Sequence, residues 1–307
     1  MNADDLLRAV RQKAWSGRQF EPPAFFDRLP TMLTHEELCM LSFLSKNLGS
    51  DGIVLDLGCF VGGSTLALAH GIRRSSNPQR HIHSFDLFEL NDVAKYRFIY
   101  SCGLPFFPGN DGLLLYSLIT KGVAENVTPH PGNVLHTLVP SSPPVRQPIS
   151  LVFLDLCKSP AITDHITRTV FPLLEPGALI VQQDFIYEFA PWVIYPFWAL
   201  RRHFTFAGYT TRHSAIFQVS SPIPSNEIES GCVSDVSSQQ IERSIEEVSK
   251  WFPYRGQRDT LDAARQIASE FPQCRDEWSL MQSWRRKNNM PDPLAEWQKL
   301  DWGVDRH

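Results

Sequence analysis

Short apolar runs alternate with helical patterns through the first 220 residues of the 307-residue chain. A run of four to eight apolar residues bounded by turn residues is typical of a buried strand. Strands are therefore expected, in chain order, at 53–57, 81–86, 123–127, 150–156 and 177–181, followed by an antiparallel pair at 209–211 and 214–219. Strands that alternate with helices form a mostly parallel sheet covered on both faces. The pattern predicts an α/β fold whose sheet ends in an antiparallel closing strand.

The two ends of the chain differ from this middle part. Residues 1–50 are expected to be mainly helical, since Thr34 and Glu37 are spaced as a capping box before an apolar run. Residues 220–238 are rich in Ser and Pro, which indicates a linker, and the charged tail that follows has a helical pattern. The expected organisation is an N-terminal helical segment (1–50), a central domain (51–220) with a long aromatic insertion typical of a lid (91–121), and a linker with a helical tail (221–307).

Composition narrows the classes of function. The chain has 29 Lys and Arg against 33 Asp and Glu, a net charge of −4, and so lacks the basic footprint of a nucleic-acid-binding protein. The charged N-terminus has no apolar signal core, and the most apolar run, 185–200, is too short to span a bilayer. We expect a cytoplasmic chain that binds neither nucleic acid nor membrane. Its six scattered cysteines suggest neither a disulfide framework nor a zinc site.

The most informative segment, V-L-D-L-G-C-F-V-G-G-S-T, follows the first expected strand. A strand that feeds a glycine-rich turn and a helix N-terminus is an arrangement that holds nucleotide-like ligands. A phosphate-binding P-loop would need a lysine where Ser64 stands. The dinucleotide fingerprint would need a glycine where Phe60 stands. These two departures favour a ligand that contains adenosine but no phosphates.

A second acidic position lies one helix and one return strand beyond this turn. Asp86 ends the strand expected at 81–86, and a carboxylate at that place accepts hydrogen bonds from a ribose diol. The alternative is an aspartate that caps the next helix. With the glycine turn at this spacing, we favour ribose binding.

The glycine segment resembles the first motif of class I S-adenosylmethionine (SAM) dependent methyltransferases. The resemblance implies a Rossmann-like class I methyltransferase sheet, with SAM as the cofactor, to which this chain adds N-terminal helices and a helical C-terminal tail. It further implies that the ligand contacts the turn, the motif acid and the neighbouring strand ends. The implied cofactor-binding residues are Asp56, Gly58, Cys59, Phe60, Gly62, Gly63, Ser64, Asp86, Leu87, Asn133 and Asp155.

Two further strand ends carry the residues expected to do chemistry. The segment V-F-L-D-L-C-K resembles that of the catechol O-methyltransferase family, in which the Asp binds magnesium and the Lys is the proposed general base. The resemblance therefore assigns these roles to Asp155 and Lys158. One strand later, where that family has an Asp-Asn pair, this chain has Gln183 and Asp184, so the implied Mg²⁺ ligands are Asp155, Gln183 and Asp184. The macrocin and sugar O-methyltransferases are also similar but carry more carboxylates at these positions, which leaves the metal open.

SAM already carries an activated methyl group, so the protein must align a nucleophile and remove a proton. Lys158, if desolvated in the crevice, is expected to lose its proton near neutral pH and serve as the base. The alternative is a surface lysine at the start of a helix. Other candidate bases are His165, His203 and His213, of which His213 is favoured. The expected catalytic set is Lys158, Asp155, Asp184 and His213.

The favoured function is SAM-dependent methyl transfer to a hydroxyl of a small molecule, such as a phenol, a sugar or a natural-product intermediate. Two alternatives remain: an N-methyltransferase acting on an amine or peptide, and a non-catalytic SAM-binding partner protein in a biosynthetic complex. The aromatic residues between 185 and 198 are expected to form either an apolar wall for the acceptor or a buried helix or homodimer interface.

Overall fold

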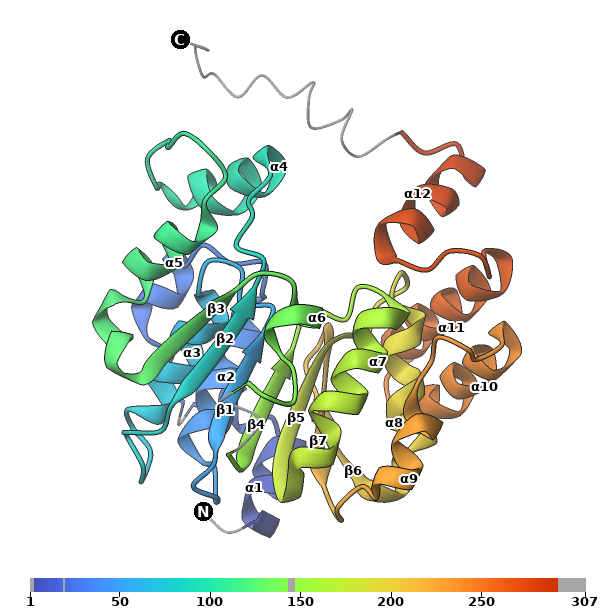
Figure 1. Ribbon diagram of the computed structural model, residues 1–307, viewed down its shortest axis with the longest axis horizontal. Helices are drawn as coiled ribbons and strands as arrows, with labels where there is room; N and C mark the ends of the chain where they lie inside the picture. Colours follow the sequence, from blue (N-terminus) through green and yellow to red (C-terminus); the bar gives the residue numbers. More distant parts are fainter. Residues whose placement is uncertain (1–2, 19, 143–146, 292–307) are drawn as a thin grey trace.

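The computed structural model describes residues 3–18, 20–142 and 147–291 (Figure 1). Its centre is a seven-stranded sheet in the order β3-β2-β1-β4-β5-β7-β6. The first five strands are parallel, and β7 runs antiparallel to both β5 and β6. The predicted fold class is confirmed. The strands are β1 (Ile53–Leu57), β2 (Ile82–Asp86), β3 (Val127–Pro131), β4 (Ile149–Leu154), β5 (Leu174–Ile186), β6 (Phe204–Tyr209) and β7 (His213–Val219).

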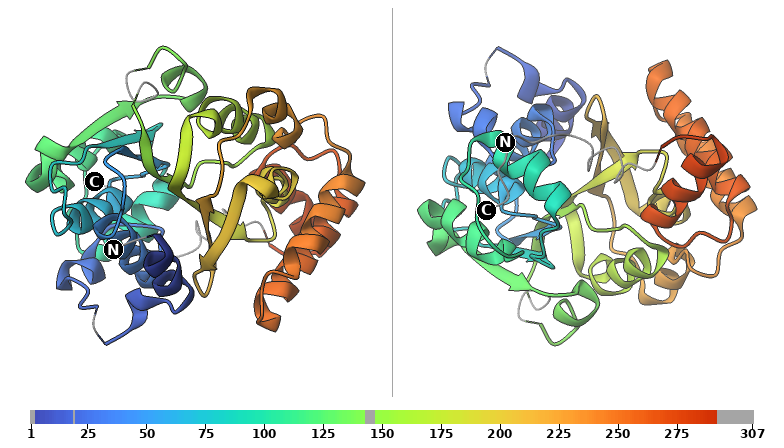
Figure 2. Two further views of the ribbon diagram at one scale, coloured as in Figure 1. Left: turned by 90° about the horizontal axis from the view of Figure 1, so that it is seen from below. Right: turned by 90° about the horizontal axis from the view of Figure 1, so that it is seen from above.

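Helices cover both faces of this sheet. The N-terminal face carries α1 (Ala3–Arg11), α2 (His35–Lys46) and α3 (Gly63–Ile72), together with the 3₁₀ turns Ala14–Ser16 and Ala24–Arg28. The opposite face carries α7 (Pro160–Thr169), α8 (Tyr195–Ala199), α10 (Ser238–Ser249) and α11 (Arg255–Glu270). Figure 2 shows the N-terminal helices in blue and the C-terminal helices in orange on opposite sides of the sheet.

The central strands are apolar on both sides because both sides are buried. Val54 and Leu151 belong to the core beneath the N-terminal helices, while Leu55 and Val152, one residue further, belong to the core beneath α7 and the C-terminal helices. Successive side chains of a strand point to opposite faces, so a continuous apolar run is what a doubly covered strand requires. This two-sided burial fixes the register of the strands, and with it the place where each strand ends.

The remaining elements are short. Between β2 and β3 lie α4 (Asp92–Ala94), a π-turn (Lys95–Ile99), a 3₁₀ turn (Tyr100–Cys102), α5 (Gly112–Ile119) and a 3₁₀ segment (Lys121–Asn126). Elsewhere the chain forms α6 (Val134–Thr137), α9 (Ser225–Ile228), α12 (Glu277–Lys287) and the 3₁₀ turns Phe171–Leu173, Pro191–Ile194, Arg201–His203 and Glu229–Gly231. No described helix is long and apolar enough to cross a bilayer.

Two predicted elements are wrong. The strand expected at 123–127 is a 3₁₀ segment, and the true strand, β3, carries Pro129 and Pro131. Proline is tolerated there because β3 is an edge strand, but it hides the β pattern in the sequence. The strand expected at 209–211 is misplaced, since the strand that pairs with β7 is β6, whose Phe204 and Phe206 pack against Phe217. The capping box at Thr34 and Glu37 is confirmed.

The aromatic run after β5 is mostly core. Phe185 and Phe197 are almost fully buried, and Phe197 stacks on Phe217 with ring centroids 4.2 Å apart. Phe252, beyond the linker, joins this group within 6.3 Å of Phe185. The reading of this run as a buried segment is therefore correct for these rings, and the C-terminal helices belong to the same core as the sheet.

A glycine in α3 allows α2 to pack closely against it. A Cβ atom at Gly71 would lie 2.1 Å from both the Ser42 carbonyl oxygen and the Ser45 hydroxyl oxygen. Overpacking of this kind typically costs about 1–3 kcal/mol, so Gly71→Ala is expected to lower the free energy of unfolding by that amount in urea titrations. The matched control is Gly122→Ala, because nothing lies within 4 Å of a Cβ at Gly122. An equal effect of the two substitutions would contradict the close contact.

Candidate active site

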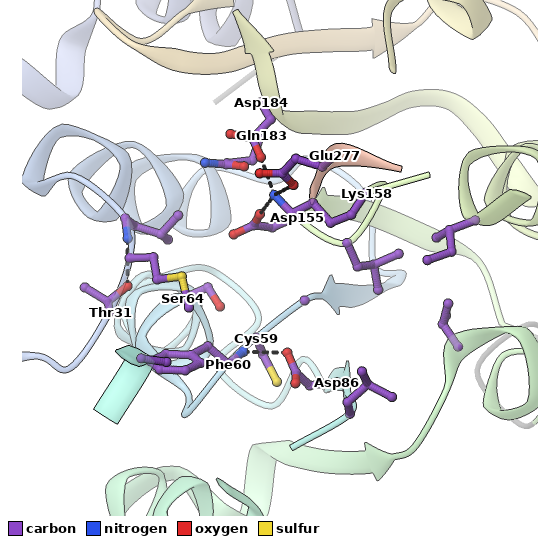
Figure 3. A pocket seen from close by; sticks show the side chains of 18 of the residues that line it. Thr31, Cys59, Phe60, Ser64, Asp86, Asp155, Lys158, Gln183, Asp184 and Glu277 are labelled. Atoms are coloured by element: carbon purple, nitrogen blue, oxygen red, sulfur yellow. Dashed lines mark hydrogen bonds and ion pairs between the residues drawn. The ribbon is translucent and has the colours of Figure 1, made fainter. Parts of the chain in front are cut away.

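A cavity of about 600 Å³ opens at the carboxyl ends of β1, β2, β4 and β5. The order of the strands reverses between β1 and β4, and ligands of open α/β sheets bind at such a switch point. The volume lies within the range of small-molecule sites. Figure 3 shows the glycine turn on one side of this cavity and a cluster of charged side chains on the other.

The glycine turn is shaped by a close approach to the end of β4. Gly58 has φ +97°, and a Cβ atom there would lie 2.7 Å from the carbonyl carbon and oxygen of Asp155. Only glycine fits this place without a backbone shift. Phe60, two residues on, also has a positive φ, +51°, and its N–H donates to Asp86 Oδ2 at 2.8 Å. The turn is therefore fixed from two neighbouring strands.

The expected cofactor residues divide into two groups. Eight of them line the cavity: Gly58, Cys59, Phe60, Ser64, Asp86, Leu87, Asn133 and Asp155. Three of them do not. Cβ atoms at Gly62 and Gly63 would meet Thr120 and Thr31, so these glycines face other parts of the protein rather than the cavity.

Asp56 is the third residue outside the cavity, and its expected contact with the ligand is corrected by the structure. Its carboxylate accepts hydrogen bonds from the hydroxyls of Ser64, at 2.9 Å, and Thr65, at 2.5 Å. These residues form the first turn of α3, where the helix dipole also favours a negative charge. Asp56 is completely buried on this face of β1 and fastens the helix to the strand.

Asp86 joins two loops at the end of β2 and lines the cavity. Besides the N–H of Phe60, its carboxylate accepts the N–H of Phe88 at 2.9 Å. Each oxygen keeps a further lone pair for a ligand hydroxyl. Across the mouth, Leu87 is 57% exposed, while the Asn133 side chain accepts the N–H of Leu135 and begins α6.

The charged cluster opposite the turn is centred on one ammonium group. Lys158 Nζ donates to Asp155 Oδ1 at 3.1 Å and to Asp184 Oδ2, and it lies 3.7 Å from Glu277 Oε2 (Figure 3). Burial by itself lowers the pKa of Lys158, but the charges of Asp155, Asp184 and Glu277 outweigh it and hold that pKa well above its ordinary value. This arrangement favours the charged form of Lys158, opposite to the expectation that it loses its proton near neutral pH.

A bulge in β5 turns the next residues into the cavity. The pairing of β5 with β7 shifts register between Gln182 and Ile186, and Asp184 within this bulge has φ +61°. Opposite it, His213 has φ +55° at the start of β7. Non-glycine residues in the left-handed region are uncommon and gather at functional sites. Strain at both partners supports a functional role for this pair.

Two polar atoms at this end of the cavity are buried without a hydrogen-bond partner: Gln183 Oε1 and His213 Nδ1. His213 Nδ1 lies 3.8 Å from Asp184 Oδ1. The other candidate bases lie outside the cavity, because His165 Nε2 bonds the Leu138 carbonyl and His203 bonds Ser221 and Glu227. His213 is thus the histidine that the structure brings to the site.

The expected magnesium ligands do not fit a divalent ion in this arrangement. Asp155 and Asp184 both direct an oxygen at the ammonium of Lys158. A metal ion bridging these oxygens would meet a positive charge at contact distance. No group of three or more His, Cys, Asp or Glu in the described ranges has a geometry that suits a metal ion.

Residues 55–185 match the family model described as a methyltransferase domain. The resemblance to class I SAM-dependent methyltransferases is thereby confirmed. No curated protein matches the chain in sequence.

Solved structures of methyltransferases are similar to part of this chain at low sequence identity. NovP, an O-methyltransferase, is 13% identical over 71% of this chain and 98% of its own, with a TM-score of 0.46. CalS11, a calicheamicin methyltransferase, is 17% identical over 70% and 91%, also with a TM-score of 0.46. An O-methyltransferase from Bacillus cereus in complex with SAH is 13% identical over 70% and 100%, with a TM-score of 0.42.

The cavity of the methyltransferase domain is completed by residues outside it. Thr31, Met32 and Leu33, just before α2, lie along one wall. Glu277, the first residue of α12, reaches the charged cluster from the C-terminal part, and Tyr187 donates its hydroxyl to Glu277 Oε1 at 3.2 Å. None of these residues stands in a strand-end pattern, so the sequence alone gives no sign that they line the cavity.

Burial raises the pKa of Asp56 to about 7, although the hydroxyls of Thr65 and Ser64 oppose the shift. The ordinary aspartate value, about 3.9, applies to the unfolded chain. Between these values the folded state holds a proton that the unfolded state has released, so this group makes stability fall as pH rises, by up to about 1.4 kcal/mol per pH unit. Above the folded pKa the contribution is constant.

Asp56→Asn removes this titration. The free energy of unfolding of wild type minus that of the variant is expected to fall between about pH 4 and pH 7 and then level off. Urea titrations of both proteins across this range measure the difference. Parallel pH profiles of the two proteins would contradict the assignment.

Proposed function

We propose that this protein is a SAM-dependent O-methyltransferase that acts on a hydroxyl group of a small molecule. The observation that carries the proposal is one cavity with two unlike ends. The glycine turn and Asp86 form the first end, and Lys158, Asp184 and His213 form the second. The first end suits an adenosine ligand, and the second offers a cation and a proton acceptor to a nucleophile.

SAM is proposed to lie along the turn from Gly58 to Ser64. Its ribose hydroxyls donate to the free lone pairs of Asp86, whose carboxylate is held in place by two backbone N–H groups. Leu87 and Asn133 flank the adenine side of the cavity. This placement directs the sulfonium methyl toward the strand end at Asp155, which touches the turn directly.

The reaction needs only alignment and one proton transfer. The acceptor oxygen attacks the methyl carbon in line with the sulfur, the C–S bond breaks, and its electron pair stays on sulfur, giving S-adenosylhomocysteine. The hydroxyl proton passes to the imidazole of His213, and Asp184, whose Oδ1 lies 3.8 Å from Nδ1, stabilises the imidazolium that forms. Lys158 stabilises the negative charge that develops on the acceptor oxygen.

The charge of Lys158 is also the reason to favour oxygen over nitrogen as the acceptor atom. An attacking hydroxyl becomes negative as it loses its proton, and a neighbouring ammonium stabilises it. An attacking amine becomes positive during methylation, and the same ammonium opposes that change. N-methylation is therefore the less favoured reaction at this site.

Cofactor binding is tested by calorimetry with SAM and S-adenosylhomocysteine. Wild type is expected to bind both, and Asp86→Ala is expected to weaken binding by about 10- to 100-fold, because hydrogen bonds to a charged group contribute about 1.5–3 kcal/mol each. Asp235→Ala, an exposed residue away from the cavity, is the control and leaves affinity unchanged. Absence of any binding to wild type would refute the proposal.

The proton acceptor is tested with labelled SAM and a panel of phenols and glycosides. His213→Gln is expected to lower kcat by about 100-fold or more, since a positioned base contributes about 10²–10⁴-fold, while the KM for SAM stays the same. His136→Gln is the matched control on the exposed surface. Wild-type turnover in the His213 variant would assign the base elsewhere, and labelling confined to amines would favour N-methylation.

A further inference from the structure

We propose that Lys158 is a built-in cation that takes the place of a divalent metal ion in this active site. The inference deepens the proposed methyl transfer and rests on it for the role of the cation.

Two carboxylates point at the same atom, Nζ of Lys158. Asp155 and Asp184 come from different strands, yet both place an oxygen within hydrogen-bonding reach of the same Nζ atom, and Glu277 approaches it to 3.7 Å. A cation that bridges two strand-end carboxylates is what a metal would be in this place. Here the bridging charge belongs to the chain itself.

The backbone that carries Lys158 is held by contacts from more than one element. The carbonyl of Lys158 accepts the N–H of Glu277 at 3.0 Å, and the carbonyl of Cys157 accepts the indole N–H of Trp192 at 2.8 Å. Tyr187 in turn holds the Glu277 carboxylate. The backbone that carries the cation is thus fixed by β5, by the segment after it and by α12.

One N–H of the Lys158 ammonium remains available for a ligand. An ammonium has three N–H donors, and two of them go to Asp155 and Asp184. Glu277 Oε2, at 3.7 Å, attracts the charge but lies beyond hydrogen-bonding distance. The side chain is 40% exposed to the cavity, so the third N–H can reach an acceptor oxygen.

The net charge of the reacting complex is small without a metal. Three ionised carboxylates and one ammonium leave two negative charges, and SAM brings a net charge of +1. The proton that passes from the acceptor hydroxyl to His213, beside Asp184, stays within the complex and does not change its net charge of −1. A divalent ion in addition would make the complex positive while the methyl group leaves a sulfonium.

The test measures metal binding directly, with Mn²⁺ as the probe and electron paramagnetic resonance as the readout. Full-length protein is freed of metal with EDTA, dialysed and titrated with and without S-adenosylhomocysteine. Wild type is expected to bind no Mn²⁺ tighter than about 1 mM. A tighter wild-type site that is lost in Asp155→Asn would overturn the proposal.

Removal of the ammonium should open the site to the probe. Lys158→Met is expected to gain one Mn²⁺ site per chain, at least about 10-fold tighter than any wild-type binding, and Lys158→Met with Asp155→Asn should lose it again. Lys250→Met, on the exposed end of α10, is the matched control. A folded Lys158→Met protein that gains no site would also count against the proposal.

Thermal unfolding curves show whether Lys158→Met is folded, and Lys158→Gln, which keeps a polar side chain, replaces it if it is not. The wild-type titration decides the question on its own if neither variant folds. Calorimetry with S-adenosylhomocysteine separates the two proposals. Absence of cofactor binding refutes the methyl transfer, whereas Mn²⁺ binding by wild type refutes only the built-in cation.

Discussion

The contact between Gly58 and the carbonyl group of Asp155 is the constraint on which the site depends. Two strands that are distant in sequence lie side by side at the switch point of the sheet, and the absence of a side chain at Gly58 lets their ends touch. The turn that faces the adenosine end and the strand end that faces the charged cluster therefore share a wall. The two ends of the cavity are brought together by packing of the backbone, before any side chain contributes.

Because the sheet is buried on both faces, aspartates near the strand ends have different surroundings: some are buried in the core and others line the cavity. Asp56 lies inside β1, on the face covered by α3, and its hydrogen bonds link the strand to that helix. Asp86 and Asp155 stand at or just beyond the ends of their strands and face the cavity. The position of an aspartate relative to the end of its strand, within one or two residues, thus decides whether its side chain is buried in the core or lines the cavity.

The parts of the site that could be predicted from sequence are those with a local signal. Each of these parts directly follows an apolar run that predicts a strand, which marks its place at a strand end. They are the glycine turn, Asp86 and the pair Asp155 and Lys158. The protonation of Lys158 could not be predicted in this way. It depends on how Asp155 and Asp184 converge on the ammonium, and on Glu277, which lies far along the chain and meets the lysine only through the packing of α12. β3 was misplaced for a related reason, because an edge strand tolerates prolines that a local pattern counts against a strand.

The first residue of α12 shows that the structural unit around the cavity is larger than the segment that matches the family model. Residues 55–185 match the methyltransferase model, but Glu277 lies outside them and is joined to Lys158 through both backbone and side chain. The helices between them fill the same core as the sheet. The C-terminal third is therefore not an appendage that could be exchanged between relatives as a module. A substitution in the C-terminal third can affect Lys158 through the carboxylate of Glu277.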